Sequence, residues 1–161
     1  MVAGPMQALD TAVKEIFEQM LGVECKQQPL KTMSQPVSAI IGLTGALSGS
    51  CTLSARPADV MAISLYLEAY PLPPMDSMLQ DAASLSNTML DAFGELGNMI
   101  AGGWKGRLQG LDSGCFLSVP SIVYGSDYVL QSGGSVLLVK RSYRFAEFEI
   151  QVAIRGDIDP L

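Results

Sequence analysis

The residues best placed for chemistry form a polar row within a segment of helical periodicity. At about 100° per residue, one side of this helix carries Asp91, Glu95, Asn98, Gly102 and Lys105. Glu95 and Asn98 are neighbours there, because residues three apart lie one turn apart. Taken alone, such a row is typical of the solvent side of any amphipathic helix.

Glycines change the interpretation of this row. Each interior glycine costs about 0.8–1 kcal/mol relative to alanine, and the helix contains Gly94, Gly97, Gly102 and Gly103. Gly97 borders the apolar side and is expected to permit close packing. Gly102 lies within the polar row, where no core neighbour requires a small residue, and Gly103 and Gly106 either flank the row or mark fraying at the helix end. We interpret the row as a low-relief polar strip that presses against a partner.

Several kinds of catalytic site are excluded. The chain has no histidine, which removes Ser-His and Cys-His nucleophilic sites and the usual ligands of catalytic zinc. Its three cysteines are widely spaced, so neither a disulfide framework nor a thiolate metal site is expected. The glycines match neither a P-loop nor a dinucleotide fingerprint. Asp91 and Glu95 stack on one helix side, which does not suit a paired-carboxylate hydrolase.

Composition limits the setting. A chain of 161 residues is expected to form one domain, 1–161. The net charge of -6 argues against a nucleic-acid partner. The segment MVAGPMQALD lacks the basic start and apolar stretch typical of a signal peptide. The most apolar region is interrupted by glycine, serine and threonine, as in paired strands rather than a membrane span. We expect a cytoplasmic protein without a membrane partner.

Three main helices are predicted. The first is Gln7–Leu21, the second is Ala58–Tyr70 after Pro57, and the third is Leu85–Leu108 with Ser84 or Ser86 as N-cap. A short helical turn is expected at Asp76–Ala83. The apolar side of the first helix is predicted to carry Leu9, Val13, Ile16, Phe17 and Met20, that of the second Val60, Ile63 and Leu67, and that of the third Met89, Phe93, Leu96, Ile100, Trp104 and Leu108.

About six strands are predicted from β-branched runs and turn residues. They are Glu24–Lys31, VSAIIGLTG and SGSCTLSAR around a turn near Gly45–Ser48, Cys115–Val123, Val136–Phe145 and Glu147–Ile154, with Gly133-Gly134 as a further turn. The order of elements lacks regular βαβ alternation, which predicts an α+β domain with a mainly antiparallel sheet.

The strand Val136–Phe145 carries Lys140, Arg141 and Arg144. Two interpretations are open: a strand with one solvated face, which we favour, and a basic docking surface.

The polar row and its surroundings resemble the CheC/CheX/FliY family of chemotaxis phosphatases. The resemblance rests on GELGNMIAGGWKGRL, on IGLTGALSGS before the second helix and on VPSIVYG after the third. It implies a CheC-like fold and an enzyme that hydrolyses the phosphoaspartate of a CheY-like response regulator. By position, Glu95 matches the glutamate that contacts a lysine of the regulator, and Asn98 matches the asparagine that holds the attacking water.

The resemblance also implies further properties. The first helix has Glu15 and Glu18 but no asparagine three residues after either, so one site per chain is expected, as in the CheX branch. Members of that branch form homodimers by joining sheets. The protein needs no cofactor or metal of its own, because the regulator supplies Mg²⁺. The alternative is a non-catalytic adaptor or flagellar-switch-type domain that binds a regulator through the same surface. Besides Glu95 and Asn98, we expect Asp91, Gly102 and Lys105 to be partner-binding residues.

Overall fold

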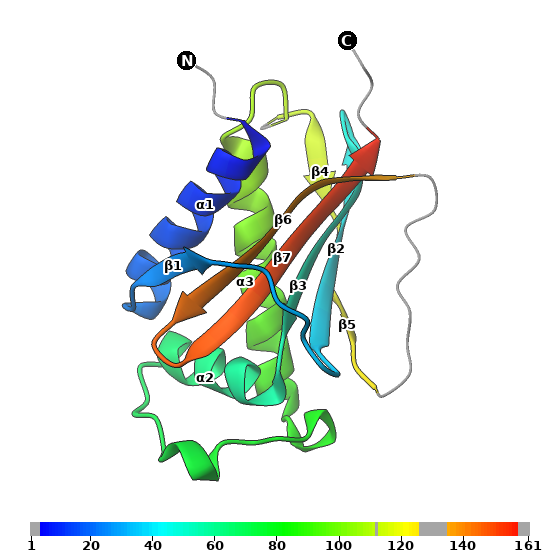
Figure 1. Ribbon diagram of the computed structural model, residues 1–161. Coiled ribbons are helices and arrows are strands. Elements are labelled where there is room, and N and C mark those ends of the chain that lie inside the picture. Colours follow the sequence, from blue (N-terminus) through cyan, green and yellow to red (C-terminus); the bar gives the residue numbers. More distant parts are fainter. Residues whose placement is uncertain (1–3, 112, 126–134, 158–161) are drawn as a thin grey trace.

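The computed structural model describes residues 4–111, 113–125 and 135–157. Three main helices and an antiparallel sheet form two layers (Figure 1), which confirms the α+β prediction. The helices are α1 (Pro5–Ile16), α2 (Pro57–Leu67) and α3 (Asn87–Gly106). A π-helical turn, Phe17–Leu21, continues α1, and two short 3₁₀ turns, Met75–Ser77 and Ala82–Ser84, lie between α2 and α3.

The sheet contains seven strands where about six are predicted. They are β1 (Cys25–Gln28), β2 (Val37–Gly45), β3 (Ser48–Ala55), β4 (Cys115–Leu117), β5 (Ser121–Val123), β6 (Val136–Phe145) and β7 (Phe148–Asp157). Their spatial order is β1-β6-β7-β3-β2-β4, and β5 also pairs with β2. The extra strand arises because the predicted strand Cys115–Val123 is interrupted between β4 and β5. Pro120 lies in this break and has no N–H to donate to a neighbouring strand.

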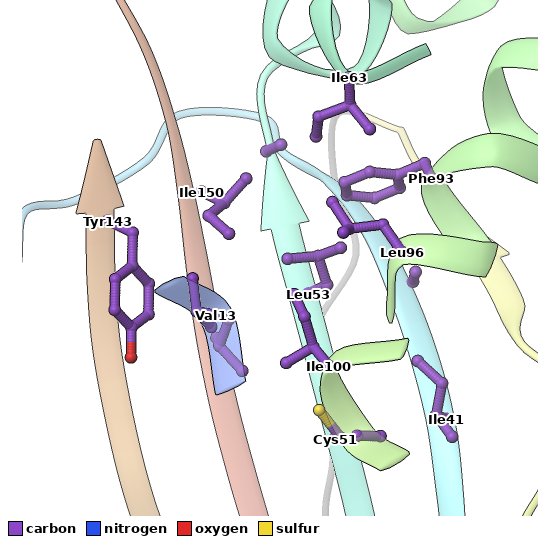
Figure 2. Packing of buried hydrophobic residues seen from close by; sticks show 14 of the residues in the cluster. Val13, Ile41, Cys51, Leu53, Ile63, Phe93, Leu96, Ile100, Tyr143 and Ile150 are labelled. Carbon is purple, nitrogen blue, oxygen red and sulfur yellow. The ribbon is translucent and has the colours of Figure 1, made fainter. Parts of the chain in front are cut away.

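The hydrophobic core lies between the sheet and the helices. Figure 2 shows Phe93, Leu96 and Ile100 of α3 beside Ile41 of β2 and Leu53 of β3, all fully buried. Alternate residues of each strand point to this side, as the period of two requires. Most predicted apolar positions of the three helices are buried in this core or packed against it. The core therefore fixes which side of α3 remains outward.

Two features of the first two helices differ from the prediction. Met20 is 52% exposed, whereas Leu21 is buried. The π-helical turn is the reason, because its wider turn rotates the residues after Ile16 away from the 3.6-residue period. α2 ends at Leu67 rather than Tyr70, where Ala69 adopts a positive φ of 57°. The predicted turn at 133–134 lies outside the described residues.

The face of the sheet opposite the helices is crossed by the linker between β1 and β2 (Figure 1). Lys31 Nζ lies 2.6 Å from Glu149 Oε2, and Gln28 Nε2 donates to the same oxygen at 3.0 Å. Burial of Glu149 favours its neutral form, but the hydrogen bonds from Lys31 and Gln28 and the charge of Arg56 outweigh this and lower its pKa. The ion pair thereby joins the linker to β7.

A second polar cluster joins α1 to β6. Arg141 donates to both carboxylate oxygens of Asp10, at 3.1 and 2.8 Å, and the Tyr143 hydroxyl donates to Asp10 at 2.6 Å. Burial of Asp10 is again outweighed by these hydrogen bonds, and the pKa of its carboxyl is lowered. Burial raises the pKa of Tyr143. The basic residues of β6 therefore do not form one docking surface, because Arg141 faces α1 whereas Lys140 and Arg144 are exposed on the opposite face.

Candidate functional site

Helix α3 is held firmly at both ends. Ser86 caps its start, because the Ser86 hydroxyl accepts a hydrogen bond from the Met89 N–H at 3.2 Å. Near its end, the buried Trp104 donates its indole N–H to the Pro5 carbonyl at 3.0 Å. Arg107 donates to the Gly103 carbonyl at 2.8 Å and pairs with Glu15 of α1. The outer side of α3 is thus carried on a fixed platform, and Glu15 has a structural role.

The glycines of α3 divide by what surrounds them. A Cβ at Gly97 would lie 2.7 Å from Cδ1 of Ile41, so the prediction that Gly97 permits close packing is confirmed. A Cβ at Gly103 would lie 3.1 Å from Cβ of Ala12, so this glycine accommodates α1 and does not mark fraying. A Cβ at Gly102 would meet only Leu117, at an ordinary contact distance of 3.7 Å. Packing therefore does not require a glycine at position 102.

The outer side of α3 presents two free carboxylates. Asp91 and Glu95 are exposed one turn apart, and neither forms an ion pair with another residue in the described parts of the chain. Gly102 and Lys105 are half-buried further along the same side. The structure thus brings all five residues of the predicted polar row onto one side of one helix. A cationic group on a partner would find both carboxylates available for pairing.

Asn98 is the unusual member of this row. It is half-buried, its Oδ1 is fully buried, and that oxygen has no hydrogen-bond partner among the described residues. An unsatisfied buried acceptor costs about 1–3 kcal/mol. Such a group in a native structure is commonly reserved for a ligand or a water. The carboxamide of Asn98 therefore has an unused acceptor one turn from the exposed Glu95.

A segment outside α3, here called the wall, lines the helix near Asn98, and none of its residues is among the predicted site residues. Gly94, Asn98 and Gly102 form one ridge of α3, spaced by four residues, and the chain between β4 and β5 lies along it. A Cβ at Gly94 would lie 3.2 Å from Pro120, while Leu117 is the neighbour of Gly102. The signal for this wall was Pro120 itself, since proline within a strand-like run indicates an interruption.

In residues 4–111, 113–125 and 135–157, no group of three or more cysteine, aspartate and glutamate side chains is arranged to hold a metal ion. Within the same residues, no helix is long and apolar enough to cross a membrane.

The comparison with protein families decides the relationship. A model of the family described as chemotaxis phosphatase CheX matches residues 37–139, more than half of the chain and all of α3. This chain belongs to the CheX family. A relative from Thermotoga maritima, named CheY-P phosphatase CheX, is 26% identical over 158 residues, which are 94% of this chain and 96% of the relative.

Solved CheX structures share the fold. The chemotaxis protein CheX from Vibrio vulnificus has a TM-score of 0.74 at 18% identity, covering 96% of this chain and 97% of that one. A chain of the CheX-CheY-BeF3-Mg²⁺ complex from Borrelia burgdorferi has a TM-score of 0.67 at 20% identity, covering 94% and 96%. The CheC-like fold inferred from the sequence resemblance is therefore confirmed. The homodimer and the cytoplasmic location stay predictions.

Proposed function

We propose that this CheX family member is a phosphatase that hydrolyses the phosphoaspartate of a CheY-like response regulator. Two findings support the class of reaction: the family match and the relative named CheY-P phosphatase CheX. The observation that carries the mechanism is the buried, unpartnered Oδ1 of Asn98 one turn from the free carboxylate of Glu95. These two groups act on the regulator from the outer side of α3.

The reaction needs little chemistry from this chain. An aspartyl phosphate is an acyl phosphate, so hydrolysis depends mainly on placing a water in line with the bond that breaks. The water oxygen bonds to phosphorus, the phosphorus-carboxylate oxygen bond breaks, and the products are the free aspartate and inorganic phosphate. For this step the Asn98 side chain turns so that Oδ1, which is buried in the free protein, faces the attacking water and accepts a hydrogen bond from it. The amide N–H₂ is able to donate to a neighbouring oxygen.

Glu95 provides the docking contact. Its carboxylate is exposed and has no ion pair among the described residues, so it pairs with a lysine beside the phosphoaspartate of the regulator. This pair fixes the position of α3, and the rigid helix then carries Asn98 to the phosphoryl group. Asp91 and Lys105 extend the polar contact, and Gly102 leaves room for the partner's backbone. The Mg²⁺ belongs to the regulator, and this chain provides no cofactor.

The decisive experiment follows loss of phosphate from an acyl-phosphorylated CheY-type receiver domain of the source organism. The native protein is expected to accelerate the loss, Asn98→Ala to abolish the acceleration while binding persists, and Glu95→Ala to weaken binding. Loss of one oriented hydrogen bond to the reacting water corresponds to about 10²–10³ in rate. Equal acceleration by the native protein and Asn98→Ala would contradict the mechanism.

The same experiment separates the adaptor alternative. An adaptor binds the receiver saturably through α3 without changing the rate of phosphate loss. The free carboxylates of Asp91 and Glu95 fit that function as well as they fit catalysis, but the unpartnered Oδ1 of Asn98 favours the phosphatase. If neither Glu95→Ala nor Asn98→Ala changes binding or turnover, both functions of this surface are contradicted.

A further inference from the structure

The sheet edge beside α3 is interrupted between β4 and β5 at Ser118, Val119 and Pro120, where the register of the two strands against β2 shifts by one residue. We call these three residues the β4-β5 corner. Two residues locate this segment along α3: Pro120 lies next to Gly94, and Leu117, which precedes Ser118, lies next to Gly102. Asn98 lies midway between these glycines, about 6 Å along the helix axis from each. The corner is therefore level with Asn98.

The corner has a fixed backbone. The Ser118 N–H donates to the Gly42 carbonyl at 2.9 Å, and the Ser118 hydroxyl accepts from the Gly42 N–H at 2.7 Å. The same hydroxyl lies 3.1 Å from the Val119 carbonyl and donates to it. Pro120 fixes its own φ and packs on α3. Val119 is held between two anchored residues and does not need to be ordered when a partner arrives.

Val119 projects from this rigid corner into solvent. The residue is 84% exposed, the largest value among the large hydrophobic residues of the described chain. A single exposed valine is ordinary. This valine differs because it stands on a hydrogen-bonded support, level with Asn98, whose buried Oδ1 lacks a partner among the described residues. A rigid β-branched side chain gives apolar contact with little loss of rotamer freedom.

We propose that the β4-β5 corner is the second wall of the docking site, and that Val119 packs against an apolar spot beside the phosphoaspartate of the receiver domain. This inference rests on the proposed function. The receiver is the occupant because the corner is continuous with the Asn98 ridge and because the adjoining carboxylates select a cationic partner surface. Glu95 and Asn98 form the first, polar wall, and Val119, once packed on the receiver, excludes bulk water from the opposite side of the contact.

Apolar contacts around a polar centre act mainly on affinity, since they shield that centre from water. Val119 is therefore a partner-binding residue, and its removal is expected to alter KM and Kd rather than kcat. The test compares Val119→Ser with Val119→Thr, which keeps the β-branched shape, and with Val136→Ser. Val136 is also an exposed valine, at 60%, and lies on β6, about 19 Å and four strand spacings from β4.

Binding is measured with the beryllofluoride complex of a CheY-type receiver domain, and turnover with its acetyl-phosphate-treated form. We expect Val119→Ser to raise Kd and KM about tenfold, which corresponds to about 1.4 kcal/mol. We expect a smaller increase for Val119→Thr and none for Val136→Ser. A higher KM with an unchanged kcat means that the lost contact had stabilised the bound ground state and the transition state equally.

The outcomes separate this inference from the proposed function. If the native protein accelerates phosphate loss but Val119→Ser keeps the native Kd and KM, the second wall is wrong and the phosphatase function stands. If Val119→Ser weakens binding but the native protein does not accelerate phosphate loss, the wall stands and the phosphatase function is wrong. If the native protein neither binds nor accelerates, both are wrong.

Discussion

Replacing Asn98 by alanine is expected to stabilise the fold while it abolishes turnover. The substitution removes a buried acceptor that has no partner among the described residues, an arrangement that costs about 1–3 kcal/mol. It also gains up to about 0.7 kcal/mol of helix propensity. The substitution also loses the packing energy of a half-buried side chain, which leaves a net gain of about 1–2 kcal/mol in the free energy of unfolding. For a chain of this size, Tm then rises by roughly 2–8 °C.

Urea and thermal unfolding of the native protein and the variant measure this gain. Asn87→Ala is the matched control. It is also an asparagine-to-alanine substitution in α3, but Asn87 is exposed at the start of the helix. Its effect is expected to stay within about 0.5 kcal/mol. A loss of stability in Asn98→Ala with a neutral Asn87→Ala would refute the reasoning, because it would mean that the carboxamide already makes a stabilising bond in the free protein.

Three further results are expected. Gly97→Ala destabilises, because its Cβ would lie 2.7 Å from Ile41, whereas Gly102→Ala stabilises by about 0.8–1 kcal/mol, and unfolding in urea distinguishes the two. The pKa values of Asp10 and Glu149 are lowered from their ordinary 3.8 and 4.5. The two ionised carboxylates therefore stabilise the fold fully above about pH 4.5, and this stabilisation is lost as the pH falls through their folded-state pKa values. Acid unfolding followed by circular dichroism measures the loss. Burial raises the pKa of the Cys51 thiol to about 12, so thiol reagents are expected to modify it at neutral pH only after unfolding, as mass spectrometry of native and unfolded samples would detect.

Local signals in the sequence predicted most of the fold. The bounds of β2 and β6 agree with the prediction, since both are β-branched runs between turn or proline residues. The third helix was predicted at Leu85–Leu108 and is Asn87–Gly106, within two residues at each end, because its apolar residues keep the helical period. Of the two predicted caps, Ser84 and Ser86, it is Ser86 that caps the helix. The error at Met20 comes from the π-helical turn, which has no sequence signal comparable to a cap or a proline.

The candidate site was predictable only on one side. A helical wheel places Glu95 and Asn98 outward because both lie on one element, and their relation follows from helix geometry alone. The opposite wall comes from a segment about twenty residues later in the chain, so its position depends on how β4 and β5 pair with β2. The buried state of Asn98 Oδ1 depends on that packing as well, and no pattern within α3 indicates it.

The glycines of α3 link the fold to the proposed docking surface. Gly94, Gly97 and Gly103 each face a side chain of a neighbouring element at 3.2 Å or less from an added Cβ, so close packing offsets their low helix propensity. Gly102 has no such neighbour, and the helix would be more stable with alanine there. Gly102 and the unpartnered Asn98 both lower the stability of α3, and both lie on the same ridge of the helix. This coincidence is expected of a surface selected for contact with another molecule, because functional sites keep features that the fold alone does not favour.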